Sequence, residues 1–136
     1  MRNSVQIRPD VSADLIERAR REPKQECCGL LAGRAGVITR TFPAKNIAPN
    51  PATSYEIAPE ETVRFMREFR AAGLEFLGIY HSHPNGENAP SARDIELAYY
   101  SEEAYFILSS RPDAAKPVRA FSIREGRVTE LQIEIL

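Results

Sequence analysis

The segment Glu75–His83 constrains the fold more than any other part of this 136-residue chain. It reads Glu-Phe-Leu-Gly-Ile-Tyr-His-Ser-His and is apolar on both faces before its histidines. A strand with this pattern has to be covered on both sides, which is the usual state of a central strand in a sheet packed between helices. The segment therefore predicts a buried central strand in an α/β fold.

The rest of the chain predicts three helices and a mixed sheet of about six strands. Helices are expected at 12–22, where Ser12 can cap the first turn, from Pro59 to Gly73, and at 91–100. Further strands are expected at 27–33, 36–42, 105–109, 118–124 and 127–135, with a short one at 55–57. No stretch is typical of a linker, so residues 1–136 are expected to form a single domain.

Charge and composition narrow the function classes. The chain has 18 Lys and Arg residues and 19 Asp and Glu residues, so it has no excess of positive charge to attract a nucleic acid. The apolar runs are too short for a membrane span, and the first eight residues are too polar for a secretory signal. The adjacent Cys27 and Cys28 make no disulfide framework. We therefore expect a cytoplasmic protein without a membrane partner.

The pattern H-x-H at His81 and His83, followed by S-x-x-D at Ser91 and Asp94, carries the chemistry. Residues two apart in a strand share a face, about 7 Å from each other, so both imidazoles can converge on one metal ion. Leu77 is expected on that same face. Asp94 lies in the first turn of the expected third helix and can point back at the strand end. Three such ligands leave a fourth position open for water, as in catalytic zinc sites.

The residues alone leave both the metal and the general base open. The same ligand set occurs in non-haem iron enzymes, and Ser91 with Asp94 can be a helix capping box and nothing more. A hydrolytic zinc site also needs a base that takes a proton from water. Glu26, just before the expected strand at 27–33, is one candidate. Other acidic residues compete on the same grounds: Glu22, Glu56, Glu60 and Glu87.

At these positions the chain resembles the JAMM (MPN+) metalloprotease family, the Mov34/MPN/PAD-1 proteins. The family pattern is a Glu followed by a Cys-Gly-Leu-Leu-like strand, then H-x-H-P, a loop, and P-S-x-x-D. Here Glu26 precedes Cys28-Gly-Leu-Leu, and the pattern continues with His81, His83 and Asp94. No position of the core pattern departs from that of the family.

The resemblance implies a cytidine-deaminase-like JAMM/MPN fold, a single-domain mixed sheet flanked by helices. It also implies hydrolysis of amide or isopeptide bonds with one Zn²⁺. Carried over by position, His81, His83 and Asp94 bind the metal. Glu26 is the general acid/base that acts on a zinc-bound water, and Ser91 steadies that water and the tetrahedral oxyanion.

The resemblance also indicates a substrate class. The segment 46–57 looks like that of small stand-alone bacterial members, which are similar to hydrolases acting on sulfur-carrier proteins. The implied partner is a ubiquitin-like or sulfur-carrier protein with a Gly-Gly tail. The loop 84–90 and the stretch 43–54 are then expected to line the channel for this tail.

Two other functions stay open at this point. One is a non-catalytic MPN-type scaffold that binds protein partners, although such forms lack the metal ligands that this chain keeps. The other is a His₂-Asp non-haem metal enzyme. Cys28 is expected to be a small buried hydrophobic residue, the alternative being a thiolate that modulates the zinc.

Overall fold

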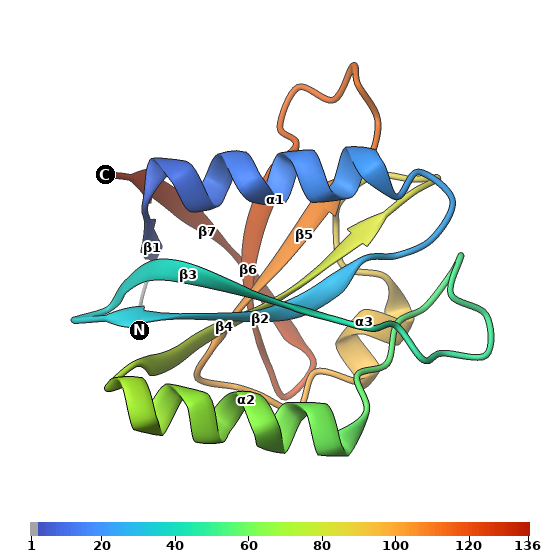
Figure 1. Cartoon of the computed structure of the whole chain (residues 1–136). Helices are drawn as coiled ribbons and strands as arrows, with labels where there is room; N and C mark the ends of the chain where they lie inside the picture. The colour runs from blue at the N-terminus through green and yellow to red at the C-terminus, as the bar shows by residue number, and fades with distance from the viewer. Residues whose placement is uncertain (1–2) are drawn as a thin grey trace.

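The computed structural model describes residues 3–136, and the described chain contains seven strands and three helices (Figure 1). The strands are β1 (Ser4–Ile7), β2 (Cys28–Arg34), β3 (Val37–Ala44), β4 (Glu75–His83), β5 (Ala104–Ser109), β6 (Val118–Arg124) and β7 (Arg127–Ile135). The helices are α1 (Pro9–Arg21), α2 (Pro59–Ala72) and α3 (Ala92–Glu96). The predicted mixed sheet flanked by helices is confirmed.

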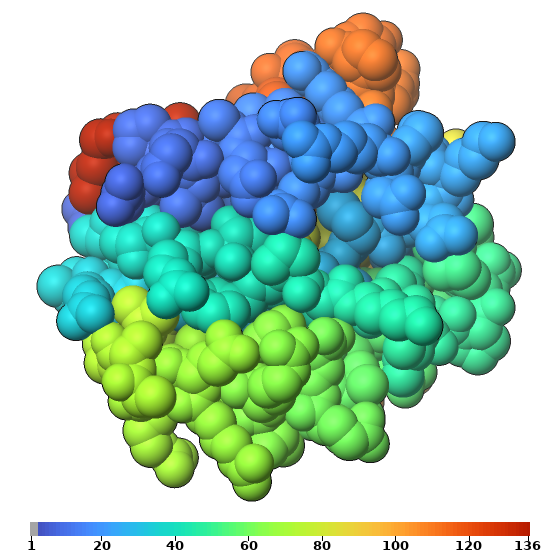
Figure 2. All heavy atoms as spheres, viewed as in Figure 1, coloured from blue at the N-terminus to red at the C-terminus, as the bar shows by residue number. Residues whose placement is uncertain are grey.

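The strands close into a barrel in the order β1-β3-β2-β4-β5-β6-β7. Strand β4 runs antiparallel to β2 and parallel to β5, while β1 is parallel to both β3 and β7. Helices α1 and α2 lie on opposite sides of the strands in Figure 1. Seen from the same side, α1, β3 and α2 form adjoining bands across the surface, coloured blue, cyan-green and green (Figure 2). No helix in residues 3–136 is both long and apolar enough to cross a membrane.

Strand β4 is covered on both faces, as its apolar pattern predicts. Tyr80 belongs to the core cluster that also contains Leu15 and Ala19 from the buried face of α1. Ile79 belongs to the cluster that contains Phe65 and Phe69 of α2. The C-terminal end of β4 is therefore held rigidly between two packed layers.

Leu77 does not lie on the face of the histidines, which is a correction to the expected alternation. Phe76 and Gly78 pair with two adjacent residues of β2, so Leu77 is an extra residue on β4. Such a β-bulge shifts the inward–outward alternation by one position. Leu77 consequently packs against the α1 side, whereas Ile79 stays on the side of His81.

Two helix boundaries differ from those expected. Helix α1 begins at Pro9 and not at Ser12, because a proline in the first turn is already set for helical geometry and Asp10 favours the positive end of the helix dipole. Ser12 is buried inside that helix. Helix α3 ends at Glu96 and does not reach 100, since the following residues turn so that the Tyr100 N–H donates to the Tyr105 hydroxyl, 2.9 Å away.

Two strand predictions also need correction. Residues 55–57 do not form a strand: the Glu56 N–H donates to the Asn46 side chain and the Glu56 carbonyl accepts from the Ile47 N–H, which is one isolated backbone bond and not a ladder. No strand is expected at β1, which is four residues long and pairs with β3 and β7. A strand this short has little alternation for a pattern to detect.

The close approach of β2 and β3 at Gly33 gives a test of the fold. A Cβ at this position would lie 1.7 Å from the Val37 carbonyl oxygen, a backbone atom that cannot move aside. We expect Gly33→Ala to lower the free energy of unfolding by about 1–3 kcal/mol or more, measured by urea denaturation. Gly86→Ala is the control, because nothing lies within 4 Å of its added Cβ. Equal losses in both variants would contradict this account.

Candidate metal centre and active site

Two imidazoles and a carboxylate converge at the C-terminal end of β4. The Nε2 atoms of His81 and His83 lie 3.1 Å apart. Each also faces Asp94, with 3.2 Å from His81 Nε2 to Oδ1 and 3.0 Å from His83 Nε2 to Oδ2. The side chain of His81 is 1% exposed, while those of His83 and Asp94 are 13% and 11% exposed. The structure thus brings together the three residues that the spacing predicts.

The S-x-x-D pattern forms the start of α3 and also orients the Asp94 carboxylate towards the histidines. Ser91 Oγ accepts from the Asp94 N–H at 3.0 Å, and the Ser91 N–H donates to Asp94 Oδ2 at 2.9 Å. This reciprocal pair is a capping box, which satisfies two backbone N–H groups at the helix start. The capping interpretation and the ligand interpretation are therefore compatible, because one carboxylate faces both Ser91 and the histidines.

The cluster has the dimensions that a divalent metal needs, and a hydrogen bond orients one of its imidazoles. The ligand atoms of His81, His83 and Asp94 all lie within 4.8 Å of one another. Their separations of 3.0–3.2 Å are close to the roughly 3.3 Å edge of a tetrahedron with bonds of about 2.0 Å. His83 Nδ1 is 2.8 Å from the Glu87 carbonyl, to which its N–H donates, and this bond directs Nε2 towards the cluster.

The electrostatics of the cluster favour a cation. Burial acts to raise the pKa of Asp94, but His81 and His83 hold it well below its usual range, so the carboxylate stays ionised. Burial lowers the pKa of His81, which is therefore a neutral imidazole. Burial also acts to lower the pKa of His83, but hydrogen bonds to Asp94 and Glu87 raise it overall. A metal ion would take the place of the proton that His83 shares with Asp94.

The carboxyl of Glu26 is buried beside this cluster. Glu26 lies just before β2 and is 5% exposed, and its Oε1 has no hydrogen-bond partner among residues 3–136. Burial raises its pKa to about 7, with His83 acting to lower it and Asp94 to raise it. A carboxyl with a pKa near neutrality suits a group that both takes and gives a proton. The competing acids are all exposed: Glu22, Glu56, Glu60 and Glu87.

A family model described as prokaryotic homologs of the JAB domain, Prok-JAB, matches residues 9–124. The chain belongs to the Prok-JAB family. It is 35% identical over 129 residues to the desampylase of Haloferax volcanii, covering 93% of this chain and 91% of that relative. It is 32% identical over 132 residues to a CysO-cysteine peptidase of Mycobacterium tuberculosis, covering 96% and 90%. A probable TtuB-protein conjugate cleaving protease of Thermus thermophilus is 36% identical over 127 residues, covering 90% and 81%.

Solved structures confirm the expected JAMM/MPN fold of this Prok-JAB protein. The solution structure of a Desulfitobacterium hafniense protein superposes with a TM-score of 0.83 at 29% identity, covering 97% of this chain and 92% of that one. A structure reported as JAMM, a metalloprotease-like zinc site in the proteasome and signalosome, gives a TM-score of 0.62 at 18% identity, covering 96% and 98%. At that identity the second likeness bears on the fold alone.

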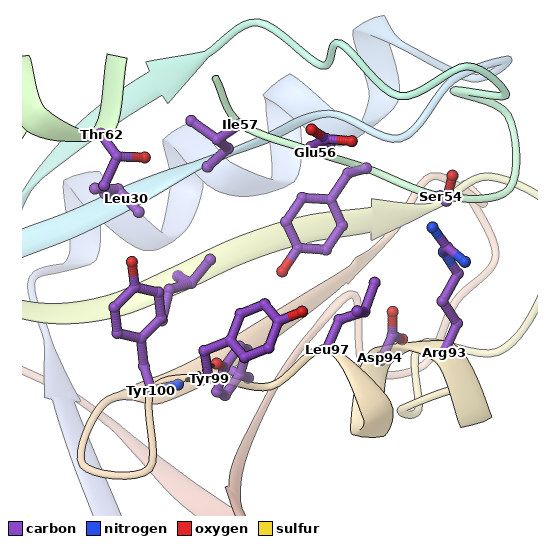
Figure 3. Close-up of a pocket in the computed structure, with 13 residues that line it drawn as sticks. Leu30, Ser54, Glu56, Ile57, Thr62, Arg93, Asp94, Leu97, Tyr99 and Tyr100 are labelled. Atoms are coloured by element: carbon purple, nitrogen blue, oxygen red, sulfur yellow. Dashed lines mark hydrogen bonds between the residues drawn. The ribbon is translucent and has the colours of Figure 1, made fainter. Parts of the chain in front are cut away.

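A groove of about 380 Å³ leads away from Asp94. Figure 3 shows Ser54, Glu56 and Ile57 along one wall and Leu97 with Tyr99 along the other. Most of the lining is apolar or aromatic: Leu30, Tyr55, Ile57, Ile79, Leu97, Tyr99, Tyr100 and Tyr105. Such a groove beside a polar cluster is the usual form of a substrate site.

This groove has few residues from the two segments that are expected to line a channel for the tail. Of the stretch 43–54 only residue 54 lines it, and the loop 84–90 contributes no lining residue. Part of that loop lines a second cavity of about 390 Å³ with residues 109–119. From the sequence, Tyr99 and Tyr100 are expected only as packing residues, whereas four of the five tyrosines in the chain line the cavity. The available signal is that Tyr99, Tyr100 and Tyr105 follow shortly after the S-x-x-D pattern.

Cys28 pairs with His81 across β2 and β4, and is 1% exposed. Burial raises the pKa of its thiol to about 12, so the thiol is neutral at physiological pH. Its Sγ lies 3.9 Å from the Ala44 carbonyl. These surroundings favour the expected small buried hydrophobic residue over a thiolate.

The ligand assignment can be tested by metal content. We expect the purified protein to bind one divalent metal ion per chain, and His83→Ala or Asp94→Ala to lose it after dialysis, as measured by plasma mass spectrometry. Glu96→Ala is the matched control, because Glu96 is an exposed acid on the same short helix. Retention of a full metal equivalent in His83→Ala, with an unchanged circular dichroism spectrum, would contradict the assignment.

The raised pKa of Glu26 predicts a pH-dependent cost to the fold. Its value of about 7 in the folded protein exceeds the roughly 4.3 of an unfolded chain, so the folded state loses stability as pH rises through this window. In metal-free protein we expect Glu26→Gln to be more stable than wild type by on the order of 1–3 kcal/mol at pH 8, with a smaller difference at pH 5. Urea denaturation with a chelator present measures this difference. A pH-independent difference would show that the carboxyl does not titrate as described.

Proposed function

We propose that this protein is a zinc-dependent isopeptidase or peptidase that hydrolyses the amide bond at the C-terminal Gly-Gly tail of a ubiquitin-like or sulfur-carrier protein. The observation that carries the proposal is the buried carboxyl of Glu26, which has an unpartnered oxygen beside the cluster of His81, His83 and Asp94. A buried acid without a hydrogen-bond partner is costly, and enzymes place such groups where a proton has to move.

We assign the metal as Zn²⁺, bound by His81, His83 and Asp94 with one position open. Two imidazoles and a carboxylate form the donor set of catalytic zinc sites. When bound, the ion supplies Lewis-acid polarisation of a carbonyl and a lowered pKa for water. The neighbouring Glu26 favours zinc hydrolysis over a non-haem iron oxygenase, which has no use for a base at this place.

Two side chains, those of Glu26 and Ser91, carry out the proton transfer and the hydrogen bonding that the reaction needs. Glu26 takes a proton from the attacking water as the new C–O bond forms, and then gives it to the leaving amine as the C–N bond breaks. Its pKa of about 7 allows both directions near neutral pH. Ser91 Oγ accepts from the Asp94 N–H, so its own proton is available to the oxyanion of the tetrahedral intermediate.

The names of similar proteins support the proposed substrate class, a protein with a C-terminal tail. Relatives that match over nine-tenths of this chain are a desampylase, a CysO-cysteine peptidase and a probable TtuB-protein conjugate cleaving protease. The groove beside Asp94 gives an extended tail a place to lie, with Ser54 and Ile57 on one wall and Leu97 on the other. We therefore propose a protein tail, and not a small molecule, as the substrate.

We further propose that residues 1–136 act as one domain in the cytoplasm, on a protein partner and not on a nucleic acid or a membrane. The free thiols of Cys27 and Cys28 suit a reducing compartment. The net charge of −1 offers no general attraction to a phosphate backbone.

Cleavage of a defined substrate tests the function. The substrate is a sulfur-carrier protein whose Gly-Gly terminus is joined through an amide to cysteine or to a short peptide, and products are identified by mass spectrometry. We expect wild type to cut after the second glycine and a chelator to stop the reaction. We expect Glu26→Gln to lower kcat by about 10²–10⁴-fold while retaining the metal.

The matched control for this experiment is Glu22→Gln, which changes an exposed acid close to Glu26 in the chain. It should leave kcat within about twofold of wild type. Full activity of Glu26→Gln would refute the assignment of the base. A metal-loaded protein that binds carriers without cutting them would point to the scaffold function, and dependence on iron and oxygen would point to the non-haem enzyme.

A further inference from the structure

The two histidines of the cluster are held in different ways. His83 donates its Nδ1–H to the Glu87 carbonyl at 2.8 Å. The Nδ1 atom of His81 is buried and has no hydrogen-bond partner among the described residues. A metal-binding histidine almost always donates its second ring N–H to an oxygen, and that bond fixes the orientation of the ring. His81 therefore needs a different restraint.

The ring of Tyr55 supplies a contact of the right kind. It stacks on the imidazole of His81, with ring centroids 4.4 Å apart and an interplanar angle of 20°. This stacking covers one face of the imidazole and limits its rotation about the Cβ–Cγ bond. Tyr55 also lines the groove, so the same side chain lies between the metal cluster and the space for substrate.

One amide side chain holds the segment that carries Tyr55. Asn46 Nδ2 donates to the carbonyl of Glu26 at 2.9 Å and to that of Ser54 at 3.0 Å. Asn46 Oδ1 accepts from the N–H of Ala48 at 3.0 Å and from that of Glu56 at 3.1 Å. An asparagine amide has two donors and an oxygen with two lone pairs, so its hydrogen-bonding capacity is fully used.

The consequence is a mechanical link between the candidate base and the groove wall. Asn46 binds the residues on both sides of Tyr55 and the backbone of Glu26 at once. Glu26 is fixed a second time, because its N–H donates to the Pro51 carbonyl at 2.8 Å. Tyr55 and Glu26 therefore cannot shift independently of each other.

We propose that Tyr55 is the positioning residue of His81, replacing by ring stacking the hydrogen bond that His81 lacks, and that Asn46 keeps Tyr55 and Glu26 in register. The inference rests on the proposed function, since it takes His81 as a metal ligand. It adds two residues to the working parts of the site and makes one groove wall part of the metal centre.

The first test compares ring-keeping and ring-removing variants of Tyr55. Zinc affinity is measured by competition with a chromophoric chelator, and ligand geometry by the visible absorption spectrum of the Co²⁺-loaded protein. We expect Tyr55→Leu to weaken zinc binding about 10-fold or more and to change the cobalt spectrum. Tyr55→Phe should stay within about twofold of wild type in both measurements, because the stacked ring remains.

Tyr99→Leu is the matched control. Tyr99 lines the same groove but is 78% exposed and belongs to the opposite wall. Its loss should raise KM for the carrier substrate and leave zinc affinity and the cobalt spectrum unchanged. Where Tyr55→Leu does not fold, Tyr55→Met replaces it, since its flexible side chain fills a similar volume without a ring.

Asn46→Asp tests the second half of the proposal. This change keeps the size and one acceptor oxygen but removes both N–H donors to the carbonyls of Glu26 and Ser54. We expect weaker zinc binding, as in Tyr55→Leu, together with a fall in kcat that exceeds the change in KM. Wild-type zinc affinity and kcat in a folded Asn46→Asp protein would overturn the role given to Asn46.

The outcomes separate this inference from the proposed function. If wild type binds zinc and cleaves the carrier tail while Tyr55→Leu binds zinc equally well with the same cobalt spectrum, the role of Tyr55 is wrong and the proposed function stands. If Tyr55→Phe loses affinity as Tyr55→Leu does, ring stacking is not the restraint. If wild type binds no zinc, the proposed function itself is wrong.

Discussion

The fixed position of β4 between β2 and β5 underlies every other feature of the site. Strand pairing on both edges and packed side chains on both faces hold the C-terminal end of β4 in place. His81 and His83 lie at this end of β4, and the capping box of α3 orients the Asp94 carboxylate towards them. The separations of 3.0–3.2 Å among the three side chains are therefore a property of the fold. A metal ion does not have to create them, which favours binding by reducing the ordering that it must enforce.

The position of Glu26 lowers the stability of this molecule. Its carboxyl is buried next to another acid, and one of its oxygens lacks a partner among the described residues. A protein selected for stability alone would place an amide or an apolar group there. The surrounding backbone bonds from Pro51 and Asn46 hold the residue in place in spite of this cost.

The parts of the structure that the sequence predicts correctly are those fixed by local patterns. The apolar run of Glu75–His83, the helix beginning at Pro59 and the hairpin of β6 and β7 each follow from residues close together in the chain. Apart from the helix boundaries, the errors concern contacts between distant residues. The bulge at Leu77 depends on the register with β2, and β1 exists through pairing with β7 at the other end of the chain.

The same division applies to the site. The spacing of H-x-H and S-x-x-D predicts that His81, His83 and Asp94 meet, because strand and helix geometry fix those distances. The place of Glu26 came from the family resemblance, since nothing in its local sequence brings it to the histidines. The positions of Tyr55 and Asn46 in the site cannot be predicted from the sequence, because their contacts depend on how an irregular segment folds back over β4.

Closure of the barrel has a further consequence for how an extended chain can be held. In the part of the protein that the structure describes, every strand has a neighbour on both sides. The pairing is nevertheless short at one place, because β1 pairs with only Val37 and Ile38 of the eight-residue β3. Among the described residues, most of that border of β3 therefore has no partner strand, and an extended chain can bond through its main-chain amides to such a border. The irregular residues 54–57, which border the cavity beside Asp94, offer a second stretch of backbone for the same kind of contact.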